Sequence, residues 1–271
     1  MPTVRIEYAS EQGQGAANED RVAAGMDWAF VLDGATAAPG VDSGCRHGVG
    51  WLVDRLASAL AAELGAERRA PLTDVLAAAI ERTRAAHGGD CDLENPDSPS
   101  STVALVRRGE ADTRSGGFSP TDVRLEYLVL ADSAVIFETE DGGVAAVSDD
   151  RLDHLPGGRP YTRELVRASR NARGGFWVAG ARVEAASEAV TGTVATAGGR
   201  FALMTDGCTR LVEYYGHSWE QVWLCLRKEG PHALISWVRN EERRHGVPRG
   251  KRHDDATALV GGFGAPRARP G

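Results

Sequence analysis

Two short apolar runs, far apart in the chain, each end in Asp-Gly. Residues 30–34 read Phe-Val-Leu-Asp-Gly, and residues 201–207 read Phe-Ala-Leu-Met-Thr-Asp-Gly. An uninterrupted apolar run predicts a buried strand, so Asp33 and Asp206 each stand where a strand ends. A strand that ends in Asp-Gly is most often followed by an ordinary hairpin turn. Interpreting the two positions as a functional site therefore requires further carboxylates beside them.

The remaining pattern predicts helices between groups of strands. Apolar residues recur at helical spacing from Val49 to Leu64, with Ser43 as a candidate N-cap, and Pro71 opens a second helix. Later helices are predicted over residues 162–171, 219–227 and 232–245. Further strands are predicted over residues 4–8, 21–24, 26–32, 101–106, 124–130, 134–139, 144–147 and 256–260.

The chain shows no internal repeat and no clear linker. We therefore expect one α+β domain over residues 1–260, with antiparallel strands in two sheets and helices outside them. Residues 148–196 have a less regular pattern, which predicts a flap-like insertion over one edge of the sheet. Residues 261–271 are expected to form a flexible tail.

Charge and composition narrow the class of protein. The chain has 271 residues, a net charge of −7 and a pI near 5.6. This balance argues against a nucleic-acid-binding surface and favours cations as ligands. The N-terminus lacks the apolar stretch of a signal peptide, and no run approaches the ~20 apolar residues of a membrane span. We expect a soluble, cytoplasmic protein that binds neither nucleic acid nor membrane.

The cysteines predict no covalent or metal framework. Cys45, Cys91, Cys208 and Cys225 form no CxxC pair. This spacing favours reduced thiols in a cytosolic protein, with neither a disulfide framework nor a zinc knuckle. Cys45 and Cys208 are expected to be small buried residues.

Acidic residues recur where the predicted strands end. The set comprises Glu19, Asp20, Asp33, Asp132, Asp206, Asp254 and Asp255. Carboxylates gathered without lysine partners raise one another's pKa unless cations neutralise them. Oxygen ligands in this number suit Mg²⁺ or Mn²⁺. One aspartate bridging two such ions, ~3.5–4 Å apart, could hold a hydroxide for in-line attack on phosphorus.

Six short motifs occur in an order that resembles the metal-dependent protein phosphatases (PPM, type 2C), and specifically a short bacterial member. They are Asn18-Glu19-Asp20, Val31-Leu32-Asp33-Gly34, Ser101-Thr102-Val103, Leu130-Ala131-Asp132-Ser133, Met204-Thr205-Asp206-Gly207 and Asp254-Asp255-Ala256-Thr257. Each motif alone is weak, but the ordered set is specific and spans residues 18–260. The resemblance implies a four-layer α-β-β-α sandwich, with two central antiparallel sheets flanked by helices and a binuclear site at one end.

The resemblance also implies roles for the matching positions. Asp33 would bridge both metals, and Gly34 would offer its carbonyl to the second metal. Asp206 and Asp254 would complete the ligands of the first. Through these metals and their water, Asp33, Asp206 and Asp254 would carry the catalysis.

Three further positions would support the site. Glu19 and Asp20 would orient metal-bound waters, and Asp132 would help to bind a possible third ion. The implied reaction is hydrolysis of phosphoserine or phosphothreonine by a metal-bridging hydroxide. The implied cofactor is Mg²⁺ or Mn²⁺, and the implied partner is a phosphorylated protein.

The sequence departs from the family's pattern where the phosphate should bind. Members commonly carry a phosphate-clamping arginine a few residues before the Glu-Asp pair, but residues 13–16 read Gly-Gln-Gly-Ala. Arg21 or Arg46 could substitute for it, and His253 could contact the substrate.

Two further departures concern catalysis and the third ion. Residues 35–37 read Ala-Thr-Ala, so the histidine proposed as general acid in some members is missing, and a metal-bound water could protonate the leaving group instead. Arg210 stands where a further acidic ligand of the third ion is often found. Two alternatives therefore stay open: a phosphatase acting on a small phosphorylated metabolite, or a catalytically silent relative with a binding or regulatory role.

One motif points to a different class of enzyme. Arg46-His47-Gly48 copies the core of the histidine-phosphatase signature, in which the histidine follows the first strand of a parallel sheet. Here His47 stands at the start of a predicted amphipathic helix. We interpret it as a residue that packs at the N-terminus of that helix.

Overall fold

The computed structural model describes residues 4–35, 40–110 and 122–264. The strands in these ranges are β1 (Val4–Glu11), β2 (Arg21–Ala24), β3 (Trp28–Leu32), β4 (Gly34–Ala35), β5 (Ser100–Ser101), β6 (Val103–Arg108), β7 (Asp122–Leu130), β8 (Ala134–Thr139), β9 (Val144–Ser148), β10 (Val190–Met204) and β11 (Ala256–Phe263). The α-helices are α1 (Val49–Leu64), α2 (Leu72–Ala86), α3 (Arg163–Ser169), α4 (Asp206–Glu213), α5 (Trp219–Lys228) and α6 (Pro231–His245). Two short 3₁₀ helices are η1 (Arg151–His154) and η2 (Val183–Glu188).

Nine strands form one antiparallel sheet, in the order β1-β11-β10-β7-β6-β3-β2, with β8 and β9 attached through β10. The first part of β10 pairs with β7, and its second part pairs with β11 and β8. Its register shifts between Thr196 and Phe201, where Gly198 and Gly199 have positive φ. Glycine adopts that conformation at no steric cost. A single long strand thus joins the strands that we expected in two separate sheets.

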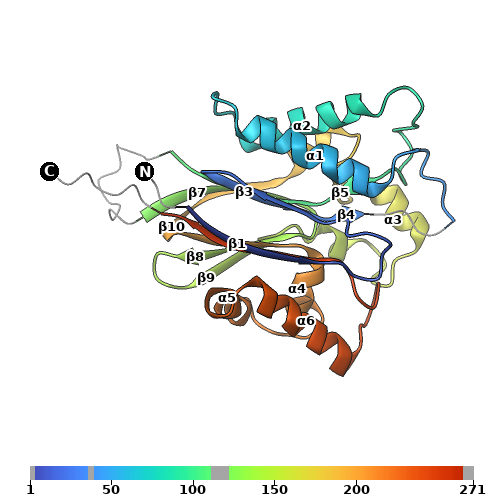
Figure 1. The fold of residues 1–271 in the computed structure, drawn as a ribbon. Helices are drawn as coiled ribbons and strands as arrows, with labels where there is room; N and C mark the ends of the chain where they lie inside the picture. The colour runs from blue at the N-terminus through green and yellow to red at the C-terminus, as the bar shows by residue number, and fades with distance from the viewer. Residues whose placement is uncertain (1–3, 36–39, 111–121, 265–271) are drawn as a thin grey trace.

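Helices cover two opposite sides of these strands (Figure 1). Helices α1 and α2 lie on one side, and α4, α5 and α6 lie on the other. Successive residues of a strand point to opposite faces, so Leu32 packs into the cluster under α1 and α2 while Val31 enters a central cluster between strands. Likewise Met204 packs towards α4–α6 and Leu203 towards the central cluster. The alternation fixes which side of each strand faces which helices.

Most predicted elements are present, but one predicted helix cap is wrong and one helix was not predicted. Helix α1 begins at Val49 with Gly48 as its N-cap residue, whereas the Ser43 hydroxyl accepts a hydrogen bond from the backbone N–H of Cys45 (3.3 Å) in the preceding loop. The predicted cap at Ser43 is therefore wrong. Helix α4, which begins at Asp206, was not predicted, because the apolar run before it resembles a strand followed by a turn.

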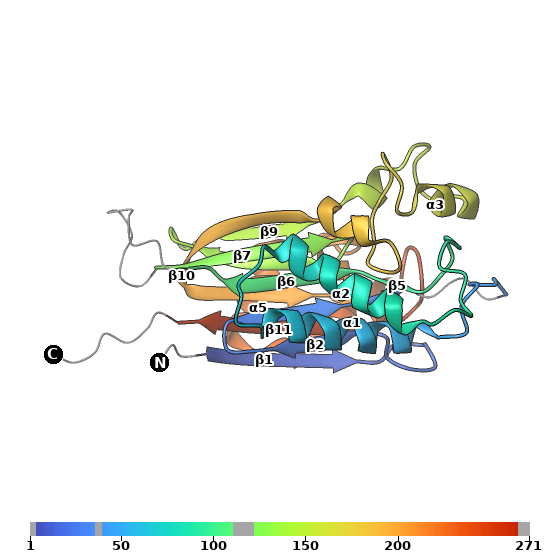
Figure 2. The same ribbon diagram turned by 90° about the horizontal axis from the view of Figure 1, so that it is seen from above.

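The segment between β9 and β10 contains η1, α3 and η2, and the last residues of the range 148–196, from Val190 onwards, belong to β10. Thr162 caps α3 by accepting a hydrogen bond from the backbone N–H of Leu165 (3.2 Å). Backbone hydrogen bonds in both directions between Ser101 and Ala179 (2.7 and 2.8 Å) attach the segment to β5. Figure 2 shows α3 standing apart from α1 and α2, beyond the ends of the strands.

Strand β11 extends to Phe263, three residues beyond position 260, where we expected the tail to begin. Phe263 is fully buried and packs on Phe201, with ring centroids 4.9 Å apart. Residues 265–271 lie outside the described residues.

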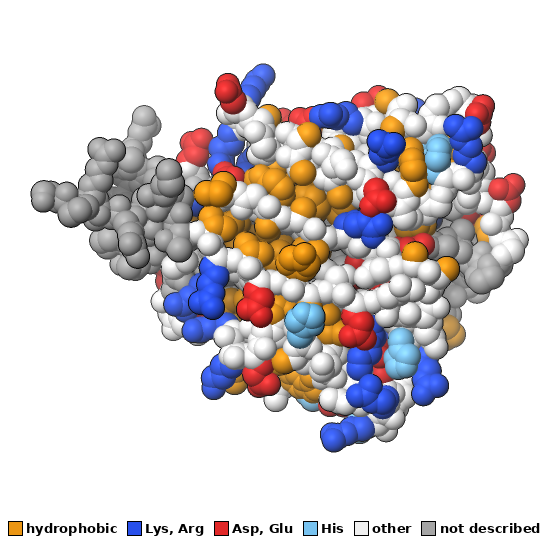
Figure 3. Space-filling view, viewed as in Figure 1, with side chains coloured by type: hydrophobic (Ala, Val, Ile, Leu, Met, Phe, Trp, Pro, Cys, Tyr) orange, Lys and Arg blue, Asp and Glu red, His pale blue; other side chains and the backbone are white. Residues whose placement is uncertain are grey.

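The surface matches the mixed composition of the chain. Figure 3 shows acidic and basic side chains interspersed on one face, with hydrophobic side chains gathered between them. Across the described ranges, no helix is both long enough and apolar enough to cross a membrane.

Two glycines in helices provide a matched test of packing. A Cβ on Gly207, in the first turn of α4, would lie 2.0 Å from the carbonyl oxygen of Asp255, whereas a Cβ on Gly50 in α1 would meet nothing within 4 Å. We expect Gly207→Ala to lower the free energy of unfolding by about 1–3 kcal/mol because the backbone must shift. Gly50→Ala should raise it by about 0.5–1 kcal/mol through helix propensity. Urea unfolding of both variants checks this, and equal effects would contradict the packing account.

Candidate functional site

A pocket of about 440 Å³ opens where several strands end. Five aspartates lie in its wall, and four of them, Asp33, Asp132, Asp206 and Asp254, are positions that the sequence singled out; the fifth is Asp97. The four come from four separate parts of the chain, so the fold has brought together the carboxylates that the sequence singled out.

Asp33 lies at the centre of this group. It follows β3, and its carbonyl accepts a hydrogen bond from the backbone N–H of Thr102 (2.9 Å). Burial raises the pKa of the Asp33 carboxyl well above its usual range, and the charges of the other pocket aspartates and of Asp20 raise it further. The next residue, Gly34, packs so closely that a Cβ would lie 2.9 Å from the carbonyl oxygen of Glu19. Close packing in β4, rather than a hairpin turn, therefore requires this glycine.

Asp206 is the first residue of α4, directly after β10. Burial, followed by the charge of Asp254, raises the pKa of Asp206 to about 6. The charge of Arg210 and the neighbouring Asp33 carboxyl lower the pKa of Asp206, but the effects that raise it are larger.

Asp20 lies behind the pocket and is buried. One of its oxygens accepts a hydrogen bond from the Thr205 hydroxyl (2.9 Å), and this hydroxyl accepts one from the backbone N–H of Thr257 (3.0 Å). Its other oxygen is buried without a hydrogen-bond partner. Burial raises the pKa of Asp20 to about 7.

Asp132 follows a strained turn. Ala131 has a φ of 64°, and its backbone N–H donates to Asp149 (3.1 Å). A left-handed alanine costs about 1–3 kcal/mol, so the surrounding contacts must hold it. Burial, followed by the charges of Asp206 and Glu213, raises the pKa of Asp132 to about 7.

Asp132 and Asp206 also line a second, smaller hollow of about 220 Å³. Its wall includes the acidic residue Glu213, whose pKa is raised mainly by burial, and the basic residue Arg249. The Arg249 guanidinium lies 3.6 Å from the Glu213 carboxylate. This hollow therefore combines acidic side chains with a positive charge.

Asp254 is held by cationic side chains. Arg210 donates to one of its oxygens (2.9 Å), and Lys251 donates to the other (2.9 Å). Arg210 also pairs with the buried Glu242 (2.7 Å), and Arg239 donates to the backbone carbonyl of Asp254 (2.6 Å). Helices α4 and α6 therefore fix the position of this aspartate. The charge of Arg210 also lowers the pKa of Asp206, against the larger effects that raise it.

Asp255 organises the loop before β2. Its two carboxylate oxygens accept hydrogen bonds from the backbone N–H groups of Gly13 and Glu19 (2.7 Å each). Only glycine fits at position 13, because a Cβ there would lie 2.4 Å from the backbone of His253 and Asp254. The residues that replace the family's usual arginine thus serve to pack this loop against the start of β11.

The three residues proposed to contact substrate lie elsewhere. Arg21 donates to Asp54 on α1 (2.5 Å), and Arg46 donates to Asp90 (2.9 Å). His253 lies 2.6 Å from the Glu242 carboxylate. None of the three lines the described pocket. Their contact with substrate therefore stays a prediction.

Apart from Lys251, the basic residues in the pocket wall come from α3 and its C-terminal end. Arg163, Arg167 and Arg170 all line it. Arg167 lies 3.3 Å from Asp97, and Arg170 donates to the carbonyl of Pro96 (2.8 Å). The sequence contained a signal for them, since arginines at positions 163 and 167 share one face of a helix. The pattern predicts the helix over residues 162–171 but does not show that it lies beside the carboxylates.

Comparison with known proteins identifies the family and finds similar folds. A family model described as protein phosphatase 2C matches residues 9–239. A search of curated proteins finds no match. The serine/threonine phosphatase PstP/Ppp from Mycobacterium tuberculosis superposes with a TM-score of 0.60 at 19% identity, over 97% of this chain and 100% of that chain. A PstP catalytic domain in complex with two manganese ions gives 0.57 at 19% identity, over 97% and 99%. Stp1 from Staphylococcus aureus gives 0.56 at 14% identity, over 96% and 95%.

The solved structures show that the fold is shared, as a mixed α and β architecture with a large antiparallel sheet. The family model covers most of the chain and confirms the resemblance drawn from the motifs, and with it the activity class of a metal-dependent protein phosphatase. The chain belongs to the protein phosphatase 2C family.

Proposed function

We propose that this protein removes phosphate from phosphoserine or phosphothreonine in proteins, with two Mg²⁺ or Mn²⁺ ions bound in the aspartate pocket. One observation carries the proposal: Asp33, Asp132, Asp206 and Asp254 converge in one pocket whose rim bears arginines. Carboxylates suit the cations, and the arginines suit the phosphate dianion.

The residues present fit such ions. The buried oxygen of Asp20 without a partner needs a proton or a cation nearby. The raised pKa values of Asp33, Asp132 and Asp206 have the same physical origin, since each carboxylate is buried among others. In the described ranges no three of these carboxylates bring their oxygens within 4.8 Å of one another. That wider spacing suits two ions that keep part of their water.

The resemblance to the family supplies the proposed ligands, and all of them line the pocket wall. Asp33 would bridge the two ions, the carbonyl of Gly34 would reach the second, and Asp206 and Asp254 would hold the first. When bound, the ions supply Lewis-acid polarisation of the phosphoryl oxygens and lower the pKa of bound water. We further propose that Asp132 and Asp206 offer a weaker third position.

The surrounding residues orient this group. Asp20, fixed by Thr205, and Glu19, whose backbone lies against Gly34, would orient water at the site. No histidine lines the described pocket, so no imidazole is placed there to donate a proton to the leaving group.

Substrate recognition falls to the segment between β9 and β10. We propose that Arg163 and Arg167 on α3 bind the phosphate or acidic side chains next to it, in place of the missing clamp arginine. Both guanidinium groups are about half exposed and sit in the pocket wall. Guanidinium groups bind phosphate oxygens through paired hydrogen bonds.

The same proposal extends to the architecture. We propose one catalytic domain over residues 1–260, built as a four-layer α-β-β-α sandwich with residues 148–196 as a flap. Three stacked apolar clusters support four layers, because each cluster fills the space between two of them.

One observation favours a second candidate function, a catalytically silent relative. Both oxygens of Asp254 are already bonded, to Arg210 and to Lys251, which weakens their availability to a cation. Measurable turnover that depends on Mn²⁺ and stops with EDTA excludes this candidate. Comparing phosphopeptides with a panel of phosphorylated metabolites separates the protein phosphatase from a small-molecule phosphatase.

Removing a central carboxylate tests the site directly. We expect Asp33→Asn and Asp206→Asn each to lower Mn²⁺-dependent hydrolysis of an aryl phosphate by on the order of 10²–10³-fold, since a lost ligand removes several kcal/mol of transition-state stabilisation. Asp141→Asn is the matched control, because Asp141 is exposed in the turn between β8 and β9. Activity retained in Asp33→Asn would falsify the assignment.

The raised pKa values predict the pH dependence of the metal-free protein. Unfolded aspartates ionise near pH 4, whereas Asp20 and Asp132 ionise in the native state at about 7 and Asp206 at about 6. Between these values the native state binds more protons. The free energy of unfolding in EDTA should therefore fall as pH rises from about 4 to about 7. Mn²⁺ affinity should rise over the same interval because the ligands must lose protons.

Urea unfolding in EDTA at a series of pH values measures the first effect, and calorimetric Mn²⁺ titration measures the second. Asp132→Asn removes one titrating group and should make the pH slope shallower, whereas Asp141→Asn should leave it unchanged. A metal-free stability that is flat or rises between pH 5 and pH 7 would contradict the burial of these carboxylates.

The arginines of α3 should affect substrate binding more than turnover. We expect Arg167→Ala to raise the KM for a phosphopeptide by on the order of 10-fold, the equivalent of about 1.4 kcal/mol, with a smaller change in kcat. Arg173→Ala is the control, since Arg173 is exposed on the same segment and does not line the pocket. Equal effects of the two variants on KM would argue against a role of α3 in recognition.

A further inference from the structure

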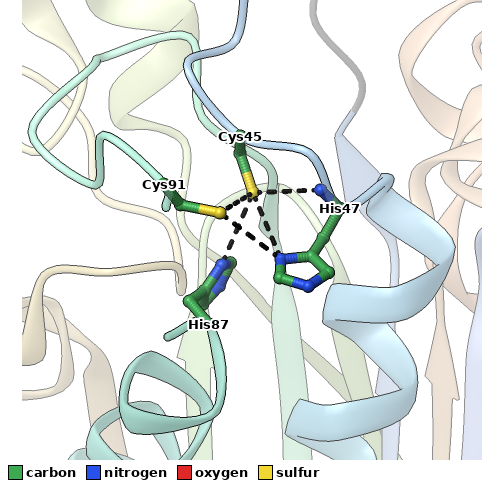
Figure 4. Close-up of side chains that lie close together, drawn as sticks. All are labelled: Cys45, His47, His87 and Cys91. Carbon is green, nitrogen blue, oxygen red and sulfur yellow. Dashed lines mark hydrogen bonds between the residues drawn. The ribbon is translucent and has the colours of Figure 1, made fainter. Parts of the chain in front are cut away.

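Two cysteines and two histidines form a second cluster, away from the aspartates. Cys45 and His47 precede α1, and His87 and Cys91 follow α2. Figure 4 shows the four side chains pointing toward one another from these two segments. All four candidate ligand atoms lie within 4.8 Å of one another, and no other His, Cys, Asp or Glu group of three or more in the described ranges is gathered so closely.

The distances have the dimensions of a tetrahedral metal site. The Cys45 sulfur lies 3.3 Å from the Cys91 sulfur and 3.4 Å from Nδ1 of His87. Nδ1 of His47 lies 3.7 Å from the Cys45 sulfur and 3.5 Å from the Cys91 sulfur. Zn–N and Zn–S bonds of about 2.0–2.3 Å in a tetrahedron place neighbouring ligand atoms about 3.3–3.8 Å apart. The observed separations fall in that interval.

We propose that these four residues bind one Zn²⁺ ion as a closed structural site. Two thiolates and two imidazoles in a tetrahedral arrangement are the ligands that zinc prefers, whereas Mg²⁺ and Mn²⁺ prefer carboxylates and water. Four protein ligands leave no open position for a substrate. This site is therefore chemically and spatially separate from the aspartate pocket.

A disulfide is the competing explanation for the two sulfurs. A disulfide needs a sulfur separation of about 2.05 Å, well below the 3.3 Å found here. It would also leave unexplained why both imidazoles direct Nδ1 at the sulfurs. Zinc accounts for all four side chains at once.

The surroundings hold the two segments together in the required arrangement. Gly44 accepts a hydrogen bond from the backbone N–H of Asp92 (2.7 Å), and the Arg46–Asp90 ion pair (2.9 Å) spans the same two segments. Trp51 on α1 stacks on His47, with ring centroids 3.9 Å apart, and meets His87 edge-on at 4.6 Å. Such contacts fix the rings of histidine ligands in the orientation that a metal needs. In addition, the backbone N–H of His47 donates to the Cys45 sulfur (3.4 Å), as suits a thiolate.

The position of the site gives it a mechanical role. It joins the N-terminal end of α1 to the segment after α2, and this segment continues into Pro96, Asp97 and Ser100 in the wall of the aspartate pocket. Zinc would brace that wall without taking part in the chemistry. The cysteine spacing alone did not predict the site, because each half contributes one cysteine and one histidine instead of a CxxC pair.

Metal analysis of the whole chain tests the proposal. We expect protein purified with reductant and without added metal to retain about one zinc per chain. Cys45→Ser and Cys91→Ser should each weaken zinc binding by at least about 10–100-fold. Cys225→Ser is the matched control, since Cys225 is a partly buried free cysteine on α5 outside the cluster. Loss of zinc in the first two variants and its retention in the control support the site.

Cobalt substitution of the wild-type chain keeps the test decisive if those variants fail to fold. Co²⁺ bound by two thiolates should give thiolate-to-metal charge-transfer absorption, which the carboxylate pocket cannot produce. The absence of both stoichiometric zinc and this absorption, with reduced thiols, would overturn the proposal. So would a Cys45–Cys91 disulfide found by peptide mass analysis, or iron in place of zinc.

Discussion

Repulsion among buried carboxylates is the constraint on which the rest of this structure depends. Asp33 lies within the electrostatic influence of Asp20, Asp132, Asp206 and Asp254, and each of these charges raises its pKa. A fold that gathers such groups gives up stability unless protons or cations neutralise them. The backbone contacts around the pocket, from the Thr102–Asp33 hydrogen bond to the strained Ala131, serve to hold this unfavourable arrangement in place.

Arginine side chains lie on two sides of the pocket aspartates. Behind the pocket, Arg210 lies between Asp254 and Glu242, so one buried guanidinium compensates acidic residues on either side. At the rim, Arg163 and Arg167 remain about half exposed and are held near Asp97. Arg210 is buried between its acidic partners, whereas Arg163 and Arg167 are partly exposed to solvent. Because Arg210 lies behind the pocket and the other two arginines lie at its rim, the base of the pocket stays acidic.

The sequence predicted the parts of the site that short motifs encode. Asp33 and Asp206 each follow an apolar strand, so their positions could be inferred from local pattern alone. The arginine rim could not, because the position of α3 depends on the Ser101–Ala179 pairing, which joins residues distant in sequence. The same reason explains the missed cluster at Cys45 and Cys91, whose halves are brought together by long-range contacts such as the packing of α1 on α2 and the Gly44–Asp92 hydrogen bond. Long-range contacts thus set the limit of what the pattern could show.

The pairing of strand β10 has a consequence for how the molecule unfolds. Its first half is bonded to β7 and its second half to β8 and β11, with Gly198 and Gly199 at the bend between them. Unfolding either half of the sheet breaks hydrogen bonds along β10. The other half of the sheet also depends on β10. The two sides of the sheet therefore share one cooperative unit of folding. The residues of the aspartate pocket come from both sides of the sheet. The pocket is therefore formed or lost together with that cooperative unit.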